Sequence, residues 1–192
     1  MKRIAILATD GFEQIELTSP KEALEKAGNK CLVVSPRSGE IQGFKHHDKA
    51  DKIKVDLELS KANPNDFDGV LLPGGVINGD ALRIERAAQQ FVKEIDRAGK
   101  PVMVICHGAW LLVSSDLVRG HRMTSWPTLQ DDIRNAGATW EDSECIRDRN
   151  WVSSRKPDDL PAFNKTIVEL VAEGQPAKAM RPESGDAIEV RQ

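Results

Sequence analysis

Cys106 lies where a cysteine can do chemistry, in the sequence Ile105-Cys106-His107-Gly108. The apolar run 102–105 predicts a buried strand, and the residues after it predict a helix. A cysteine at such a junction faces free N–H groups and the positive end of the helix dipole, which favour a thiolate. The turn is similar to the nucleophile elbow of hydrolases, where a small residue such as Gly108 gives the backbone room. Cys106 is therefore a candidate nucleophile, and the alternative is a buried core cysteine.

Two neighbouring features supply groups that a cysteine nucleophile needs. His107 follows the cysteine directly, although adjacency alone does not let its ring reach the preceding sulfur. Its backbone N–H is better placed to bind an oxyanion, while the side chain acts as acid or base toward a substrate. Pro73-Gly74-Gly75 ends another apolar run without side-chain bulk, so its N–H groups can approach a carbonyl. The alternatives are a surface histidine and a plain turn.

Carboxylates gather after the first apolar run of the chain. Asp10, Glu13 and Glu16 all lie in the segment Thr9 to Glu16. One of them is a candidate for orienting or protonating the cysteine. A helix start attracts acidic residues for electrostatic reasons alone, which is the alternative for each of them.

The remaining cysteines and histidines predict no second site. Cys31 and Cys145 lie in or beside predicted strands without a neighbouring base, so we expect structural roles. Three widely spaced cysteines without a C-x-x-C pair argue against a disulfide framework and against structural zinc. His46, His47 and His121 lie outside the predicted strand-end loops and are expected at the surface.

Alternating elements position these residues. Strands are predicted at 3–8, 30–35, 69–72 and 102–105, with short ones near 144–146 and 151–154. Helices are predicted from Ser19-Pro20 to Gly28, over 80–98, from His107, near 129–135 and over 157–172. The polar excursion 36–56 predicts a hairpin that stands off the sheet. This alternation favours an α/β fold with a doubly wound, mostly parallel sheet and helices on both faces. Sites in such sheets form at the carboxyl ends of strands.

Length, composition and charge limit the function classes. The 192 residues are 40% hydrophobic and 30% charged, which suits one globular domain. The 27 basic and 30 acidic residues give a net charge of −3, so nucleic acid is not the expected bulk partner. No apolar run reaches the roughly 18 residues of a membrane span, and the first run is too short for a secretory signal. We expect a cytoplasmic protein with a domain over 1–174 and a flexible tail over 175–192.

Five motifs in this order closely resemble the DJ-1/PfpI superfamily. They are D-G-F-E-x-x-E at 10–16, L-P-G-G at 72–75, V-I-C-H-G at 104–108, T-S-W-P at 124–127 and W-V-S-S-R-x-P-x-D-L-P-A-F at 151–163. The resemblance covers about Lys2 to Ala172, and the excursion with Lys45, His46 and Asp48 is similar to the PfpI and general-stress-protein branch. It implies a flavodoxin-like fold and a homodimer or hexamer.

The resemblance also implies roles for single residues. Cys106 would be the nucleophile, Glu16 the acid that hydrogen-bonds its sulfur, and His107 the partner histidine. Gly75 and His107 would offer oxyanion N–H groups. In PfpI-like members an acid after the P-G-G loop, often from a neighbouring subunit, completes a triad with the histidine. Asp80 lies at that place, although the loop V-I-N-G-D departs from the family in spacing and residue size.

Two classes of function follow from the resemblance, and neither needs a metal or an organic cofactor. The first is a cysteine-dependent enzyme for reactive carbonyls: a glyoxalase III-like enzyme that converts methylglyoxal to lactate, or a deglycase for glyoxal and methylglyoxal adducts on proteins. An intracellular cysteine peptidase is the alternative enzyme. The second class is a stress-response chaperone or redox sensor, in which Glu16 stabilises an oxidised Cys106. The expected partners are a small carbonyl substrate or a glycated or unfolded protein. Glutamine amidotransferases share the sheet and the elbow but carry a late H-x-E pair, which does not follow Cys106 here.

Overall fold

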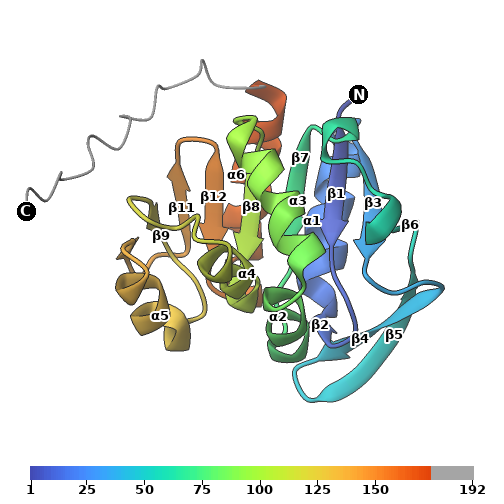
Figure 1. Ribbon diagram of the computed structural model, residues 1–192, viewed down its shortest axis with the longest axis horizontal. Coiled ribbons are helices and arrows are strands. Elements are labelled where there is room, and N and C mark those ends of the chain that lie inside the picture. The colour runs from blue at the N-terminus through green and yellow to red at the C-terminus, as the bar shows by residue number, and fades with distance from the viewer. Residues whose placement is uncertain (174–192) are drawn as a thin grey trace, which may run out of the picture.

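A seven-stranded sheet forms the centre of the molecule (Figure 1). The computed structural model describes residues 1–173, so the predicted tail over 175–192 lies outside the described residues. The strand order is β11-β12-β8-β7-β1-β3-β6, and every neighbouring pair is parallel except β11 with β12. The strands are β1 (Arg3–Leu7), β3 (Lys30–Ser35), β6 (Leu57–Glu58), β7 (Gly69–Leu72), β8 (Val102–Ile105), β11 (Cys145–Asp148) and β12 (Trp151–Ser154). The predicted fold class is confirmed.

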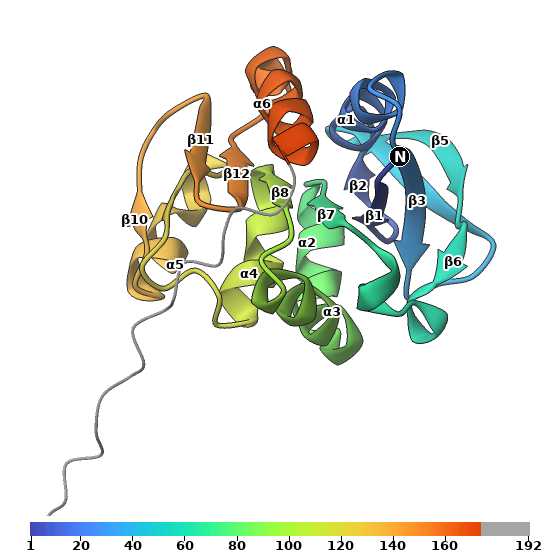
Figure 2. The same cartoon turned by 90° about the horizontal axis from the view of Figure 1, so that it is seen from above.

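The strands β7, β8 and β12 are buried along their whole length because helices cover both faces of the sheet. All four residues are buried in β7, in β8 and in β12, as expected of a parallel sheet between two helical layers. On one face lie α1 (Gln14–Lys26) and α6 (Leu160–Glu173). On the other lie α2 (Val76–Arg83), α3 (Arg86–Arg97) and α4 (Ala109–Ser114) (Figure 2). Each layer encloses one apolar cluster, the first around Phe163 and the second around Phe91.

The first helix begins earlier than the sequence pattern predicts. Ser19-Pro20 was expected to start it, but α1 starts at Gln14 and contains Pro20 in its interior. A proline there removes the N–H that would bond the carbonyl four residues earlier, which belongs to Glu16. Burial of Leu17 and Pro20 offsets this loss. The early start matters because it places Glu16 in the first helical turn.

The expected helix over 80–98 is two helices, α2 and α3. The chain leaves helical geometry at Glu85, whose side chain accepts a hydrogen bond from the Ala87 N–H at 3.2 Å and caps α3. Glutamate is not among the preferred capping residues, so the sequence carried little sign of the break. The helix α2 starts at Val76, directly after the glycine pair that ends β7.

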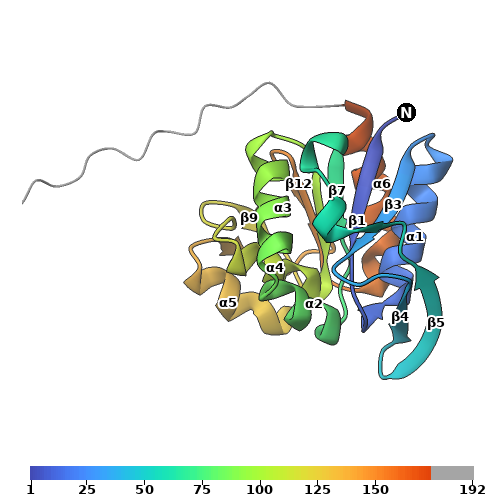
Figure 3. The same cartoon turned by 45° about the vertical axis from the view of Figure 1, so that its right-hand side comes forward.

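The polar excursion forms the predicted hairpin, made of β4 (Glu40–Lys45) and β5 (Asp48–Lys54) (Figure 3). The short strand β2 (Phe12–Glu13) pairs with β4 and completes a separate three-stranded sheet. The Gly11 N–H also donates to the Gln42 carbonyl at 2.8 Å. The hairpin is therefore joined to the acidic segment that follows β1.

The outer part of the sheet carries short elements. These are β9 (Arg122–Met123), α5 (Gln130–Asn135) and β10 (Thr139–Trp140), and β9 and β10 pair in parallel. Within residues 1–173 we find no helix with the length and apolar content that crossing a membrane would require.

Candidate active site

Cys106 has the left-handed backbone of a strained elbow, with φ of +59°. It begins a 3₁₀ turn over Cys106–Gly108 that runs into α4. A left-handed residue with a side chain costs about 1–2 kcal/mol, so the surrounding structure must hold it in place. A Cβ on Gly108 would lie 2.5 Å from the Leu72 carbonyl oxygen, so only glycine lets the turn approach β7 this closely. This agrees with the small residue expected after the nucleophile.

The His107 ring reaches the sulfur, although adjacency along the chain does not predict this contact. Its Nδ1 lies 3.3 Å from Cys106 Sγ, because the left-handed backbone of Cys106 turns the two side chains to the same side. The ring packs edge-on against Trp110, with centroids 5.0 Å apart, and is stacked on Trp126 at 5.9 Å. Burial lowers the pKa of His107 to about 4, so the imidazole is neutral at pH 7.

Glu16 brings a fully buried carboxyl group to the same place. Its Oε2 accepts a hydrogen bond from the Gly74 N–H at 2.9 Å, whereas its Oε1 has no hydrogen-bond partner among the described residues. Burial, and then the negative charge of Glu13, raise the pKa of Glu16 to about 8. The carboxyl group is therefore mainly protonated at pH 7 and can donate a hydrogen bond.

Gly74 lies where the carboxyl group and the thiol meet. A Cβ at this position would lie 2.3 Å from Glu16 Oε2 and 3.1 Å from Cys106 Sγ. Any side chain here would force the two groups apart. The structure thus brings four sequence-predicted residues together: Cys106, His107, Glu16 and Gly74.

The backbone N–H groups of His107 and Gly75 both point at the sulfur. Each of them lowers the pKa of the Cys106 thiol. Burial raises that pKa by more than the N–H groups lower it, and a negative charge on Glu16 would raise it further. The pKa of the Cys106 thiol therefore lies well above its ordinary value. The N–H groups at the helix start favour the thiolate, as expected, but they do not decide the pKa of the thiol. The thiol is 7% exposed, and loss of solvent outweighs the two N–H groups.

Asp80 lies apart from this group. Its side chain is exposed on α2 and makes no hydrogen bond or ion pair with any other described residue. The preceding Gly79 does approach the elbow, since a Cβ there would lie 2.6 Å from the His107 carbonyl oxygen. A third partner for His107 is therefore not supplied by Asp80 within one chain.

Asn78 is a site residue that the sequence did not reveal. Its fully buried side chain donates to the carbonyls of Pro73 and Gly74 at 3.0 and 3.1 Å and accepts from the Thr9 N–H at 2.8 Å. It thereby ties the loop after β1 to the loop after β7. In the sequence it is only a polar residue two positions after Val76, where α2 starts.

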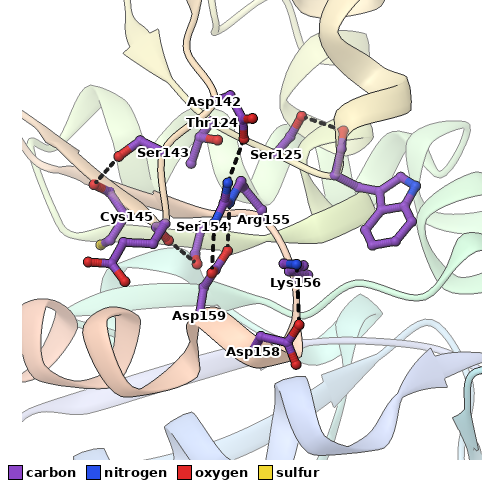
Figure 4. Close-up of polar contacts among 12 residues, drawn as sticks. Thr124, Ser125, Asp142, Ser143, Cys145, Ser154, Arg155, Lys156, Asp158 and Asp159 are labelled. Carbon is purple, nitrogen blue, oxygen red and sulfur yellow. Dashed lines mark hydrogen bonds and ion pairs between the residues drawn. The ribbon is translucent and has the colours of Figure 1, made fainter.

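Residues at the end of β12 and just after it form hydrogen bonds and ion pairs with one another and with the loop before β11, at the carboxyl edge of the sheet (Figure 4). Arg155 binds Asp159 through two nitrogens, at 2.8 and 3.0 Å, and reaches Asp142 at 2.5 Å. Ser154 Oγ donates to the Glu144 carbonyl at 2.6 Å. These contacts join the loop before β11 to the start of α6, so this motif supports the edge of the site rather than providing reactive groups.

A second buried histidine lies near the opposite ends of the strands. His121 was expected at the surface, but it is 3% exposed, stacked on Trp151 at 3.9 Å, and its Nδ1 lies 2.9 Å from Asp148 Oδ2. The expectation failed because the partners come from β11 and β12, far along the chain. His46 and His47 are exposed, as expected.

The other cysteines differ from Cys106. Cys31 and Cys145 are free thiols, and burial raises the pKa of both, in Cys31 to about 12. Neither has a histidine beside it in the structure. Within residues 1–173 no group of three or more His, Cys, Asp or Glu side chains is arranged to hold a metal ion.

The sequence and the fold are similar to those of known proteins. The sequence profile of the DJ-1/PfpI family matches residues 2–170. A deglycase from Pyrococcus abyssi is 41% identical over 169 residues, which cover 88% of this chain and 99% of the relative. "Putative cysteine protease YraA" from Bacillus subtilis is 39% identical over 170 residues, covering 88% and 98%. Among solved structures, a two-domain protein from Anabaena variabilis with DJ-1/ThiJ/PfpI-like and ferritin-like domains superposes with a TM-score of 0.85 at 31% identity. That match covers 90% of this chain and 48% of the longer one.

Proposed function

Because the chain belongs to the DJ-1/PfpI family, we propose that it is a cysteine-dependent enzyme that acts on reactive carbonyls, as a deglycase or glyoxalase for methylglyoxal and its adducts. The observation that carries this proposal is the convergence of the Cys106 thiol, the neutral His107 ring and the protonated Glu16 carboxyl group. The deglycase relative supports the same chemistry.

In the first step Cys106 Sγ adds to the aldehyde carbon of methylglyoxal. The new S–C bond forms as the carbonyl π electrons move onto oxygen. The thiol proton passes to the Glu16 carboxyl group while that group gives its own proton to the oxygen, so a hemithioacetal forms and Glu16 stays neutral. The N–H groups of His107 and Gly75 lie beside Sγ and stabilise the developing negative charge on oxygen. Glu16 is in place to hand a proton to that oxygen, because its carboxyl group is neutral at pH 7.

In the second step the neutral His107 ring acts as the base. It removes the hydrogen from the carbon that carries the sulfur and returns a proton to the neighbouring carbon, while the hydroxyl proton moves from the first oxygen to the second. The product is a thioester of lactate. Water then cleaves the thioester and regenerates the thiol. Methylglyoxal plus water thus gives lactate, so one carbon is oxidised and its neighbour reduced without an outside oxidant.

A glycated amine enters the same sequence after one additional bond cleavage. Cys106 Sγ forms a bond to the carbinol carbon of the adduct as the carbon–nitrogen bond breaks, and the thiol proton leaves with the amine. The overall change is adduct plus water to free amine plus lactate. A glycated protein is therefore the proposed partner alongside the small carbonyl.

Peptide cleavage is the alternative that the Bacillus subtilis relative suggests. Expulsion of an amine from an amide needs a well-oriented proton donor, and a pKa of about 4 makes His107 a poor one at pH 7. In this proposal an acid such as Asp80 would have to come from a second copy of the chain in a dimer or hexamer. Carbonyl chemistry needs no such partner and is therefore preferred.

The test compares the wild type with Cys106→Ala and with a matched control, Cys145→Ala, which removes another free thiol. Each protein is incubated with methylglyoxal, and lactate is resolved by enantiomer. A preformed adduct freed of methylglyoxal and a fluorogenic peptide are assayed in parallel.

We expect lactate from the wild type and from Cys145→Ala only. Lactate from Cys106→Ala would refute the mechanism, peptide cleavage alone would favour the peptidase, and silence in all assays would favour a redox or chaperone role.

A further inference from the structure

Two N–H groups of the candidate active site lie on a part of the backbone that rotates easily. Gly74 and Gly75 have no Cβ, so the peptide groups on either side of Gly74 meet little steric hindrance to rotation. The Gly74 N–H nevertheless donates to Glu16 Oε2 at 2.9 Å, and the Gly75 N–H faces Cys106 Sγ. Because glycine does not fix these directions, another group must hold the two peptide groups in place.

Asn78 binds the carbonyl oxygens of these same two peptide groups. Its Nδ2 donates to the Pro73 carbonyl at 3.0 Å and to the Gly74 carbonyl at 3.1 Å. The first carbonyl shares its peptide group with the Gly74 N–H, and the second shares its peptide group with the Gly75 N–H. In a planar trans peptide group the C=O and the N–H point in opposite directions. A donor that holds the oxygen on one side therefore sets the direction of the N–H on the other side.

Asn78 is itself held in place from two sides. Its side chain is fully buried, and its Oδ1 accepts a hydrogen bond from the Thr9 N–H at 2.8 Å. Its backbone belongs to the first turn of α2, where the Gly79 N–H donates to the Gly75 carbonyl at 2.9 Å. A neutral amide offers two donors and an acceptor at one end, so it suits two carbonyls and one N–H.

We propose that Asn78 is a positioning residue: through the two carbonyls it aims the Gly74 N–H at the buried carboxyl group and the Gly75 N–H at the developing oxyanion. This inference deepens the proposed function and rests on it only for what the two N–H groups do during the reaction. The orientation of the peptide groups is a property of the folded protein before any substrate binds. It can therefore be tested both with and without turnover.

The two peptide groups should not depend on Asn78 equally. The Gly74 carbonyl has a second donor, the Glu13 N–H at 3.2 Å, which comes from β2. The Pro73 carbonyl, by contrast, accepts a hydrogen bond from no other described residue. Loss of the Asn78 side chain should therefore release the Gly74 N–H more than the Gly75 N–H, an order that a general loosening of the loop does not predict.

The test without turnover uses NMR spectra of isotope-labelled protein. Glu16→Ala removes the acceptor of the Gly74 N–H, so the Gly74 amide proton should move upfield when Asn78 is present. Asn78→Leu keeps the size of the side chain but removes its polar atoms, and in this background most of the response should be lost. Cys106→Ala makes the same comparison for the Gly75 amide proton, whose response should fall by less. A larger loss at Gly75 than at Gly74 would contradict the proposed arrangement.

Two control backgrounds separate this role from a loss of packing. Ile77→Ala loosens a neighbouring contact between α2 and the loop after β1, because the Ile77 side chain lies against Gly11. Asn164→Leu removes another partly buried amide, which joins α6 to α1 through a hydrogen bond of 2.8 Å. Both backgrounds should keep the full response to Glu16→Ala. An undiminished response in Asn78→Leu, or an equal loss in Ile77→Ala, would overturn the proposal.

The test with turnover follows lactate formation from methylglyoxal. Removal of one oxyanion donor costs about a hundredfold or more in kcat, so the partial misdirection in Asn78→Leu should lower kcat about tenfold and leave KM near its wild-type value. A wild-type kcat in folded Asn78→Leu would overturn the proposal. A wild type that forms no lactate would instead refute the proposed function and leave the amide-proton result standing, so the two failures are distinguishable.

Hydrogen exchange on the wild type decides the question should Asn78→Leu fail to fold. The side-chain amide protons of Asn78 should exchange far more slowly than those of Asn135, which is exposed on α5. Equal exchange rates would show that the Asn78 side chain is not held between the two carbonyls and would overturn the proposal.

Discussion

The two ends of β8 and β12 each bury a histidine beside tryptophan and carboxyl groups, yet only one end leaves those groups unsatisfied. At the amino end, His121 lies 2.9 Å from Asp148 Oδ2 and is stacked on Trp151, whose indole N–H donates to Asp96 at 2.8 Å. Asp148 also accepts from the Arg122 N–H. Every polar group named there has a partner.

At the carboxyl end the same kinds of residue are left incomplete. The polar neighbour of the His107 ring is a thiol, and Glu16 Oε1 has no hydrogen-bond partner among the described residues. Buried polar groups without partners cost stability, about 1–3 kcal/mol each. The difference teaches that a cluster whose polar groups all have hydrogen-bond partners stabilises the fold. A cluster with unpaired polar groups can instead form hydrogen bonds with a substrate.

Gly74→Ala should show the largest effect on activity, because its Cβ would separate Glu16 from Cys106. A misplacement of about 1 Å in a catalytic group can cost about a hundredfold in rate. We expect a loss of at least that size in lactate formation. The control at the amino end is Gly99→Ala, since no atom lies within 4 Å of the Gly99 Cβ position; Gly99 has a positive φ, which Gly74 does not, so this control adds backbone strain without a clash. Equal activity loss in both variants would contradict the proposed geometry.

Glu16→Gln should change the pH dependence of stability. The folded pKa of about 8 is above the ordinary value of 4.5, so the folded state holds a proton that the unfolded state releases, and stability falls as pH rises from about 4.5 to 8. The shift corresponds to about 5 kcal/mol. The variant should lose this alkaline decline in denaturant unfolding followed from pH 5 to 9. A wild-type curve without the decline would show that Glu16 is ionised in the folded protein.

His121→Ala should test the amino end. It leaves Asp148 without its buried partner and a cavity against Trp151, so the free energy of unfolding should fall by about 2–4 kcal/mol. Activity per folded molecule should remain, because the site lies at the other end of the strands. Urea unfolding with the exposed His47→Ala as control measures the first effect. Loss of activity in fully folded His121→Ala would mean that the two ends are coupled.

Cys106→Gly should show the smallest effect and one of opposite sign. Glycine adopts the left-handed backbone without strain, so replacing Cys106 should stabilise the protein by about 1 kcal/mol while abolishing activity. Cys106→Ala keeps the strain and serves as the reference in thermal unfolding. A Cys106→Gly variant less stable than Cys106→Ala would show that the elbow is not strained.

The parts of the fold that depend on local pattern were predictable from the sequence. The bounds of β3, β7, β8 and β12 agree with the predicted ranges. For β7 and β8 the reason is that strands buried on both faces read as continuous apolar segments. Cys106 and the glycine pair could be found for the same reason, since they terminate such runs. The break at Glu85 and the start of α1 at Gln14 could not, because tertiary contacts decide both.

The remaining features of the site depend on three-dimensional contacts. The reach of the His107 ring follows from one backbone angle at Cys106. The protonation of Glu16 follows from complete burial, and the role of Asn78 follows from two loops that meet only in the folded chain. No spacing along the sequence encodes these contacts directly.

The tryptophans around the two histidines also make the molecule its own optical reporter. The chain has four Trp and no Tyr, so its near-ultraviolet emission comes from indole alone. Trp151 is stacked on His121 at one end, and Trp110 and Trp126 flank His107 at the other. Protonated imidazole quenches indole emission. Protonation of His121 should therefore lower the fluorescence of Trp151, and protonation of His107 should lower that of Trp110 and Trp126. With Trp151→Phe, or with Trp110 and Trp126 both replaced by Phe, each end can be followed separately in solution without any attached dye.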